Sequence, residues 1–134
     1  MENINFHHYG LALKDFNNAI KFHANLGYQC SEIIFDSLQN VELVLCTSDN
    51  FPTVELVKPY NSNSPISNYL KKNNEMIYHV CYEINNYEED LIRIFGENRA
   101  ICVSTPKPAI LFENRLVSFY YITDVGLIEL LQQK

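Results

Sequence analysis

The sequence predicts an α+β fold in which two βαβββ modules form a half-barrel cup. Two stretches that start at Phe6 and Ile77 share one pattern, an apolar-rich strand that carries a histidine near its start and leads through a polar turn into a helix. Each half continues with short β-prone runs and ends on a similar strand that holds one glutamate, Glu55 or Glu129. Such a repeat predicts the architecture as a whole, because each copy should fold as the same unit.

The composition is that of a globular protein with a real core. The chain has 134 residues, of which 47% are hydrophobic, and its aromatic residues include nine Tyr and eight Phe. Its formal net charge of -6 would repel a phosphate backbone, which excludes nucleic acid as a partner. No run reaches the ~18 apolar residues of a membrane span, and the N-terminus lacks the pattern of a secretory signal. We therefore expect a cytoplasmic protein with no membrane partner.

The four cysteines occur singly along the chain, without the close spacing of zinc or redox motifs. They are predicted to be reduced and mostly buried thiols that behave as small hydrophobic residues. These residues are Cys30, Cys46, Cys81 and Cys102.

The first module, residues 1–60, is predicted to begin with a strand over residues 6–13. Asp15 is a suitable N-cap for the helix that follows, whose apolar stripe starts at Phe16. Gly27 suits a left-handed C-terminal cap for this helix. The remaining strands of the module are expected over residues 32–35, 41–46 and 53–57.

A polar linker over residues 61–74 is expected to join the two modules within a single domain, residues 1–134. A short helix is possible from Ser64, where a proline follows at the first helical position. Ile66 and Leu70 lie at helical spacing, which indicates that this segment packs against the rest of the protein.

The second module, residues 75–134, repeats the strand and helix of the first. Asn86 is the expected N-cap of its helix, with Glu89 three residues later to complete a capping box. This helix is predicted to stop near Gly96, and the strands that follow are expected over residues 101–104, 115–122 and 126–131.

One histidine and one glutamate occupy matched places in each module. His8 and His79 lie in the first strands, and Glu55 and Glu129 lie in the last strands. An ionised carboxylate within an apolar strand is costly to bury unless something positive meets it. Two imidazoles and two carboxylates suit a divalent first-row metal, which predicts a site for one ion of Co, Ni, Zn, Mn or Fe.

Each of these residues alone would be read as a core histidine or as a water-facing glutamate. Their matched positions in the repeat favour the metal site instead. His7 would replace His8 as a ligand if the strand slipped by one residue, and the alignment of the repeat with His79 selects His8. His23 lies on an apolar helix stripe and is read as a half-buried packing residue.

The sequence resembles the vicinal oxygen chelate superfamily, most closely its methylmalonyl-CoA epimerase branch, over nearly the whole chain. The segments that carry this resemblance are His8-Tyr-Gly-Leu-Ala-Leu-Lys-Asp, Val54-Glu-Leu-Val-Lys-Pro, Ser64-Pro-Ile-Ser-Asn-Tyr-Leu, Ile77-Tyr-His-Val-Cys-Tyr-Glu-Ile and Gly126-Leu-Ile-Glu-Leu. The resemblance implies the glyoxalase-like fold and places the metal ligands of the family on His8, Glu55, His79 and Glu129.

By the same resemblance we expect an epimerase that moves the proton α to a thioester carbonyl in a small-molecule substrate such as an acyl-CoA. Glu129 and Glu42 are the implied catalytic residues, and Glu42 could equally be a solvent-facing strand residue. Epimerisation needs two such groups, because the proton must return on the opposite face of the carbon. The resemblance also implies a homodimer.

Two segments depart from the epimerase pattern, which leaves other activities open. Epimerases carry a glycine-rich loop and a His-Pro-Lys loop where this chain has a segment over residues 107–115 and a short turn over residues 122–126. Arg115 could pair with a substrate carboxylate or lie at the surface. The alternatives are a lactoylglutathione lyase and a non-catalytic binding or resistance protein on the same scaffold. An extradiol dioxygenase is disfavoured, since that branch uses two histidines and one glutamate in a longer chain.

Overall fold

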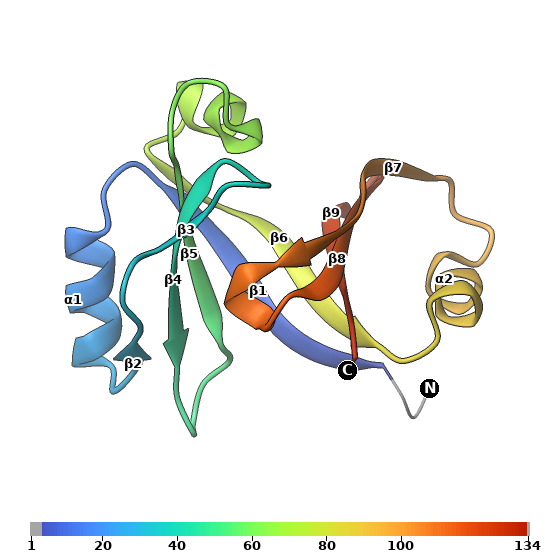
Figure 1. Cartoon of the computed structure of the whole chain (residues 1–134), viewed down its shortest axis with the longest axis horizontal. Helices are drawn as coiled ribbons and strands as arrows, with labels where there is room; N and C mark the ends of the chain where they lie inside the picture. Colours follow the sequence, from blue (N-terminus) through green and yellow to red (C-terminus); the bar gives the residue numbers. More distant parts are fainter. Residues whose placement is uncertain (1–3, 134) are drawn as a thin grey trace. The chain divides into compact units, whose positions relative to one another are not determined.

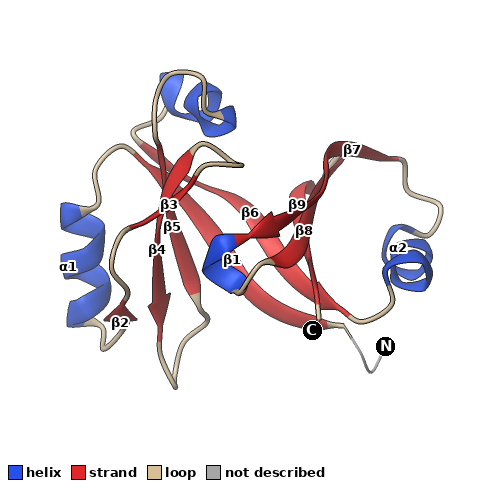
Figure 2. Ribbon diagram, viewed as in Figure 1, coloured by secondary structure: helices blue, strands red, loops and turns tan. Residues whose placement is uncertain are grey.

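The computed structural model describes residues 4–133 and confirms the predicted α+β class. The chain divides into two compact units, residues 8–78 and residues 79–133 with residues 4–7. Each unit contains a mixed sheet and one α-helix, as Figure 2 shows by colour. Among the described residues, the structure has no helix with the length and apolar character needed to cross a membrane.

The unit of residues 8–78 has its first and last strands side by side. Its sheet has the order β2-β4-β5-β1, with β3 also paired to β4. β1 runs parallel to β5, and β4 runs antiparallel to β5. Figure 1 shows α1 alongside β2 and β4. The elements are β1 (Asn5–Leu13), α1 (Asn17–Asn25), β2 (Gln29–Cys30), β3 (Ile34–Asp36), β4 (Val41–Thr47), β5 (Val54–Pro59) and the 3₁₀ helix η1 (Pro65–Lys71).

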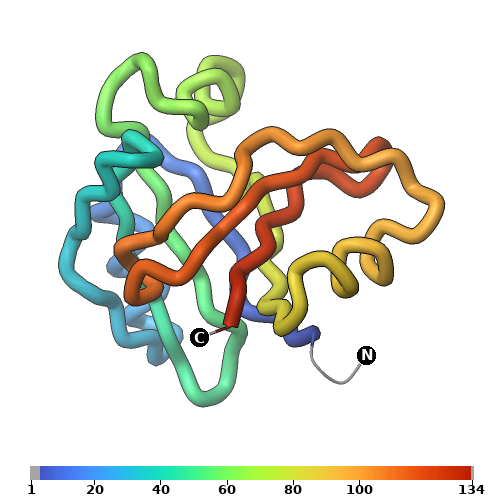
Figure 3. Tube along the Cα trace, turned by 45° about the vertical axis from the view of Figure 1, so that its right-hand side comes forward, coloured from blue at the N-terminus to red at the C-terminus, as the bar shows by residue number. Residues whose placement is uncertain are grey.

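The unit of residues 79–133 repeats this pairing. Its sheet has the order β6-β9-β8-β7, with β6 parallel to β9 and β8 antiparallel to both of its neighbours. The Cα trace in Figure 3 shows β7 and β8 running together over a long hairpin. The elements are β6 (Glu75–Ile84), α2 (Tyr87–Phe95), β7 (Ala100–Ala109), the 3₁₀ helix η2 (Ile110–Phe112), β8 (Arg115–Ile122) and β9 (Gly126–Gln132).

Each sheet packs one face against its helix. Phe16 and Leu13 meet Val54 and Leu56 in the core of the first unit, as the apolar stripe of the helix predicts. In the second unit the residues of α2 pack against a cluster that includes Leu130. Burial of these apolar side chains is the main favourable term that holds each helix on its sheet.

Two predicted strands, those over residues 32–35 and 101–104, have different bounds in the structure. The strand expected over residues 32–35 is observed as β3, shifted to Ile34–Asp36, and the short strand β2 before it was not predicted; both pair with β4. β7 is longer than the predicted 101–104 and continues through Pro106 and Pro108, with register shifts on the way. Proline is tolerated there because β7 lies at the edge of its sheet, where a ladder hydrogen bond is not required on the outer side.

The short helix expected from Ser64 is observed. η1 follows Ser64, which is its N-cap, and Ile66 and Leu70 are buried. The residues between the two modules thus form an ordered segment that packs through the apolar positions expected from the sequence.

The cap of α1 lies one residue from the predicted place. Phe16 is the residue at the helix boundary, one position after the predicted N-cap Asp15, and it has helical dihedral angles and no side-chain capping bond. The Asp15 carboxylate still accepts a hydrogen bond from the Asn17 amide at 2.9 Å, which satisfies a free N–H of the first turn. Gly27 adopts a positive φ of 104°, as expected for a glycine that ends a helix.

The capping box of α2 uses a different acid from the one predicted. The Asn86 side chain accepts from the Glu89 amide, as expected for an N-cap. The returning bond comes from Asp90, which is buried and whose Oδ2 accepts from the backbone N–H groups of Asn85 and Asn86, both at 2.9 Å. Glu89 is exposed, so Asp90 rather than Glu89 closes the turn into the helix.

We therefore expect Asp90→Ala to destabilise the protein by roughly 1–3 kcal/mol, because two backbone N–H groups would lose the buried carboxylate that accepts from them. Glu89→Ala is the matched control and should cost about 0.5 kcal/mol or less, since that side chain is exposed. Urea unfolding followed by circular dichroism measures both values. Equal losses in the two variants would contradict this assignment.

Candidate metal centre

The two units hold a histidine and a glutamate in the same strand register. In the parallel pair β1/β5, Gly10 lies opposite Glu55, and His8 is two residues before Gly10. In the parallel pair β6/β9, Cys81 lies opposite Glu129, and His79 is two residues before Cys81. Residues two apart in a strand share a face. Each histidine therefore lies on the same face as the glutamate of its own module.

In the first unit the pair is fully removed from water. His8 is 0% exposed and Glu55 is 5% exposed, and the distance from His8 Nε2 to Glu55 Oε1 is 3.7 Å. The His7 ring lies edge-on to Phe112 at 5.2 Å between ring centroids. The register expected from the repeat is therefore the one observed, with His8 beside the glutamate.

In the second unit the contact is closer. The distance from His79 Nε2 to Glu129 Oε1 is 3.1 Å, and both residues are 2% exposed. A buried carboxylate must be met by hydrogen-bond donors or by positive charge, because its desolvation is otherwise too costly. The structure thus repeats one buried imidazole and one buried carboxylate in each module.

Phe119 is a neighbour of the second pair that the sequence analysis missed. Its ring lies edge-on to His79 at 5.4 Å between centroids, and its backbone lies directly opposite Glu129 in the β8/β9 hairpin. The corresponding residue opposite Glu55 is Leu45. Counting back from the short turn between β8 and β9 would have identified Phe119, because hairpin register follows from the turn.

The donor atoms of the two pairs fit a divalent first-row metal. Each pair offers one imidazole nitrogen and one carboxylate oxygen from buried, strand-held side chains. Imidazole and carboxylate together suit zinc, iron, cobalt, nickel and manganese. A cation would also supply the positive charge that the two buried carboxylates require.

Glu42 does not lie with these residues. In the β4/β5 pairing Leu45 is opposite Glu55, so Glu42, three residues away, faces the other side of the sheet. Its carboxylate pairs instead with Lys58 at 3.4 Å, and both side chains are partly exposed. Glu42, expected by resemblance to act together with Glu129, thus pairs with Lys58 and lies on the opposite face of the sheet from Glu55.

Arg115 is also engaged within its own unit. Its Nη1 lies 2.5 Å from Glu83 Oε2, and its Nε donates to the carbonyl of Phe112 at 3.4 Å. The guanidinium thus ties the start of β8 to β6. This ion pair leaves less of its charge available for a substrate carboxylate than the sequence alone would suggest.

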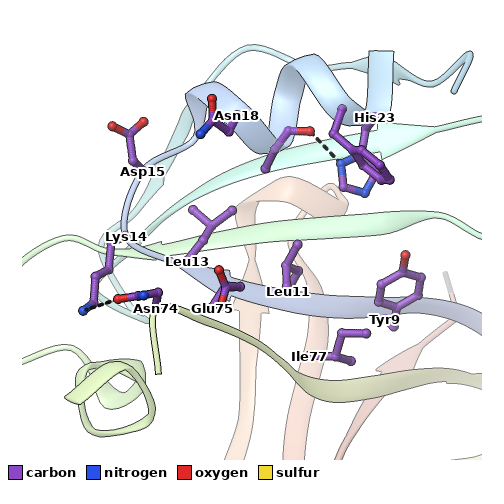
Figure 4. Close-up of a pocket in the computed structure, with 12 residues that line it drawn as sticks. Tyr9, Leu11, Leu13, Lys14, Asp15, Asn18, His23, Asn74, Glu75 and Ile77 are labelled. Atoms are coloured by element: carbon purple, nitrogen blue, oxygen red, sulfur yellow. Dashed lines mark hydrogen bonds between the residues drawn. The ribbon is translucent and has the colours of Figure 1, made fainter. Parts of the chain in front are cut away.

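A groove of about 610 Å³ lies on the helix side of the first unit. Figure 4 shows Leu11 and Leu13 of β1 and His23 of α1 among its lining residues. His23 is buried, and its Nδ1 lies 2.7 Å from the Ala19 carbonyl, which agrees with the packing role predicted for it. Because Leu11 and Leu13 alternate with Gly10 and Ala12 along β1, this groove is separate from the face of His8.

The chain is also similar to proteins of known family and structure. A segment of 102 residues is 29% identical to the mitochondrial methylmalonyl-CoA epimerase of Dictyostelium discoideum, covering 75% of this chain and 61% of that protein. The match thus spans about three fifths of the length of that relative.

Solved structures agree over nearly the whole chain. The methylmalonyl-CoA epimerase of Mycobacterium tuberculosis superposes with a TM-score of 0.78 at 20% identity, covering 97% of this chain and 88% of the other. A substituted form of the Streptomyces coelicolor epimerase, in complex with 2-nitronate-propionyl-CoA, gives 0.77 at 21% identity and covers 98% of both chains. At 20–21% sequence identity, this structural similarity establishes the fold.

The family model for the glyoxalase/bleomycin resistance protein/dioxygenase superfamily matches residues 7–119, which include strands of both modules. The match, the glyoxalase-like fold and the duplicated modules agree with one another. The chain belongs to the glyoxalase/bleomycin resistance protein/dioxygenase superfamily.

Proposed function

We propose that His8, Glu55, His79 and Glu129 together bind one divalent metal ion. The observation that carries this proposal is the repeated register, which gives each module one buried imidazole and one buried carboxylate on the same face. The similarity to solved structures over 97% or more of the chain supports the joining of both modules around one site. The mixed nitrogen and oxygen donors support a first-row metal.

We further propose that the protein is an epimerase that moves the proton α to the thioester carbonyl of an acyl-CoA. The relatives named as methylmalonyl-CoA epimerases, and the neighbour in complex with 2-nitronate-propionyl-CoA, support this class of substrate. A bound divalent metal would polarise the carbonyl oxygen and stabilise the charge that develops there. The remaining chemistry belongs to the side chains of the chain itself.

Proton transfer requires a carboxylate on each side of the reacting carbon. Glu129 is the first candidate by family resemblance. Glu42 faces away from the ligand side of its sheet, whereas Glu55 occupies in the first module the register position that Glu129 has in the second. We therefore assign the second proton transfer to Glu55, and the two glutamates would serve opposite faces of the substrate carbon.

The metal assignment predicts that His79→Ala lowers metal affinity more than tenfold, because the ligand set would be incomplete. His7→Ala is the matched control, since His7 packs against Phe112 and should leave metal content near one ion per chain. Both variants would be purified without chelator, dialysed against limiting cobalt and measured by elemental analysis. Unchanged occupancy in His79→Ala would exclude His79 as a ligand.

The assignment of the two carboxylates predicts different losses in two variants. With one epimer of methylmalonyl-CoA in D₂O, Glu129→Gln should slow inversion by about 10²–10⁴-fold. Glu55→Gln keeps an oxygen donor and, with each epimer supplied separately, should lose inversion of both while deuterium still enters the epimer whose α-proton faces Glu129. Chiral analysis together with mass spectrometry separates exchange from inversion.

The control for this experiment is Glu42→Gln, which should retain inversion within about twofold, because Glu42 pairs with Lys58 on the other side of the sheet. A loss in Glu42→Gln equal to that in Glu129→Gln would contradict the assignment to Glu55. Turnover of methylglyoxal with glutathione, with no exchange on the acyl-CoA, would show that the protein is a lactoylglutathione lyase instead.

We also propose that the protein forms a homodimer through the groove of the first unit. Phe22 and Ile77, which line it, are 60% and 62% exposed, so a partner could bury much apolar surface there. Ile77→Glu should then halve the mass measured by light scattering, whereas Val125→Glu, at another exposed apolar position, should not. An unchanged dimer in Ile77→Glu would place the interface elsewhere.

A further inference from the structure

The fold brings together two cysteines that are far apart in the sequence. Cys30 of β2 lies directly opposite Cys46 of β4 in antiparallel pairing. Their sulfur atoms are 3.0 Å apart, and both are free thiols. The other two cysteines, Cys81 and Cys102, lie in the other unit and on different strands.

The backbone around Cys30 and Cys46 is suited to a covalent bridge. The neighbouring residues Ser31 and Leu45 carry the cross-strand hydrogen bonds, with the Ser31 amide donating to the Leu45 carbonyl and the Leu45 amide to the Ser31 hydroxyl. Since bonded and non-bonded pairs alternate in an antiparallel ladder, Cys30 and Cys46 form a non-hydrogen-bonded pair. Cα atoms in such pairs are about 4.5 Å apart, which falls within the range of disulfides.

Only a small movement separates the observed thiols from a disulfide. A disulfide bond is about 2.05 Å long, so the sulfur atoms must approach by about 1 Å, which rotation about the Cα–Cβ bonds can supply. We propose that Cys30 and Cys46 are a site of oxidative modification, at which a peroxide converts the two thiols into an intramolecular disulfide.

The unequal exposure of the two thiols sets the order of the reaction. Cys30 is partly exposed, whereas Cys46 is 0% exposed among the apolar core residues of its unit. Burial raises the pKa of the Cys46 thiol, so it remains protonated and inaccessible to an oxidant. Cys30 is therefore the sulfur that meets hydrogen peroxide first.

The reaction balances with hydrogen peroxide as the two-electron oxidant. The Cys30 thiolate attacks one peroxide oxygen, which breaks the O–O bond, releases hydroxide and leaves a sulfenic acid. The Cys46 sulfur then attacks the Cys30 sulfur, and the S–O bond breaks as the thiol proton of Cys46 leaves with the hydroxyl group as water. Two thiols and one peroxide thus give one disulfide and two waters.

The bridge would lie on the helix side of the sheet. Cys46 is opposite Val54, one position away from the Leu45–Glu55 pair, so its side chain faces away from the face of Glu55. Oxidation should therefore tie β2 to β4 and stabilise the first unit without removing a ligand of the proposed metal site. This property is independent of whether the protein is an epimerase.

The test is to treat the intact, reduced protein with hydrogen peroxide and to count thiols by alkylation under denaturing conditions. Wild type and Cys102→Ser should each lose two thiols, with a peptide map that joins Cys30 to Cys46. Closing this loop should raise Tm by about 5–15 °C. Cys30→Ser should lose no pair of thiols, and peroxide should leave its Tm unchanged.

Two further readouts keep the test decisive. Cys46→Ala should trap Cys30 as a sulfenic acid that reacts with dimedone, and Cys30→Ser should give no such adduct. If the core variant does not fold, the thiol count and Tm of Cys30→Ser still test the proposal. Bound cobalt should be equal in the reduced and oxidised wild type. A disulfide through Cys102, or free Cys30 and Cys46 after Cys102 has been oxidised, would overturn the proposal.

Discussion

The parallel pairing of the first and last strands is the constraint on which the rest of the structure depends. In each module this pairing sets a glutamate opposite the residue that lies two positions after a histidine. A slip of one residue would turn the glutamate to the helix side, where apolar residues pack. The pairing therefore fixes both the core and the donor atoms at once. Burying a carboxylate costs free energy, so this arrangement is stable only where a cation or a protonated group contacts each glutamate.

The matched register of the histidines and glutamates could be predicted from the sequence because it is repeated. A single glutamate in an apolar strand would not have indicated a metal site. Glu55 and Glu129, however, occupy matched positions in the last strands of the two modules, and His8 and His79 occupy matched positions in the first strands. Strand alternation, which is a local property, then assigns their faces correctly. The strand over residues 115–122 and the burial of Ile66 and Leu70 could also be predicted, because each depends on a residue pattern within one short segment.

Features that depend on partners far along the chain could not be predicted in this way. Glu42 was assigned by resemblance, and only the pairing of β4 with β5 shows that it faces Lys58 on the other side. Cys30 and Cys46 look isolated in the sequence and are joined only by the pairing of β2 with β4. The extension of β7 through Pro106 and Pro108 was not predicted, because a sequence does not reveal which strand will lie at the edge of a sheet.

The duplicated modules keep their histidine and glutamate but differ in the residues beside them. Gly10 lies opposite Glu55 where Cys81 lies opposite Glu129, and Leu45 stands in the place of Phe119. The two modules supply the same pair of donor groups, which suits a metal ion because an ion is not chiral. Under the proposed function, the two epimers of an acyl-CoA must each be held with the α-proton toward a different carboxylate, which requires unequal walls. The differences at these flanking positions would supply unequal walls, while the duplicated histidine and glutamate pairs keep the shared chemistry.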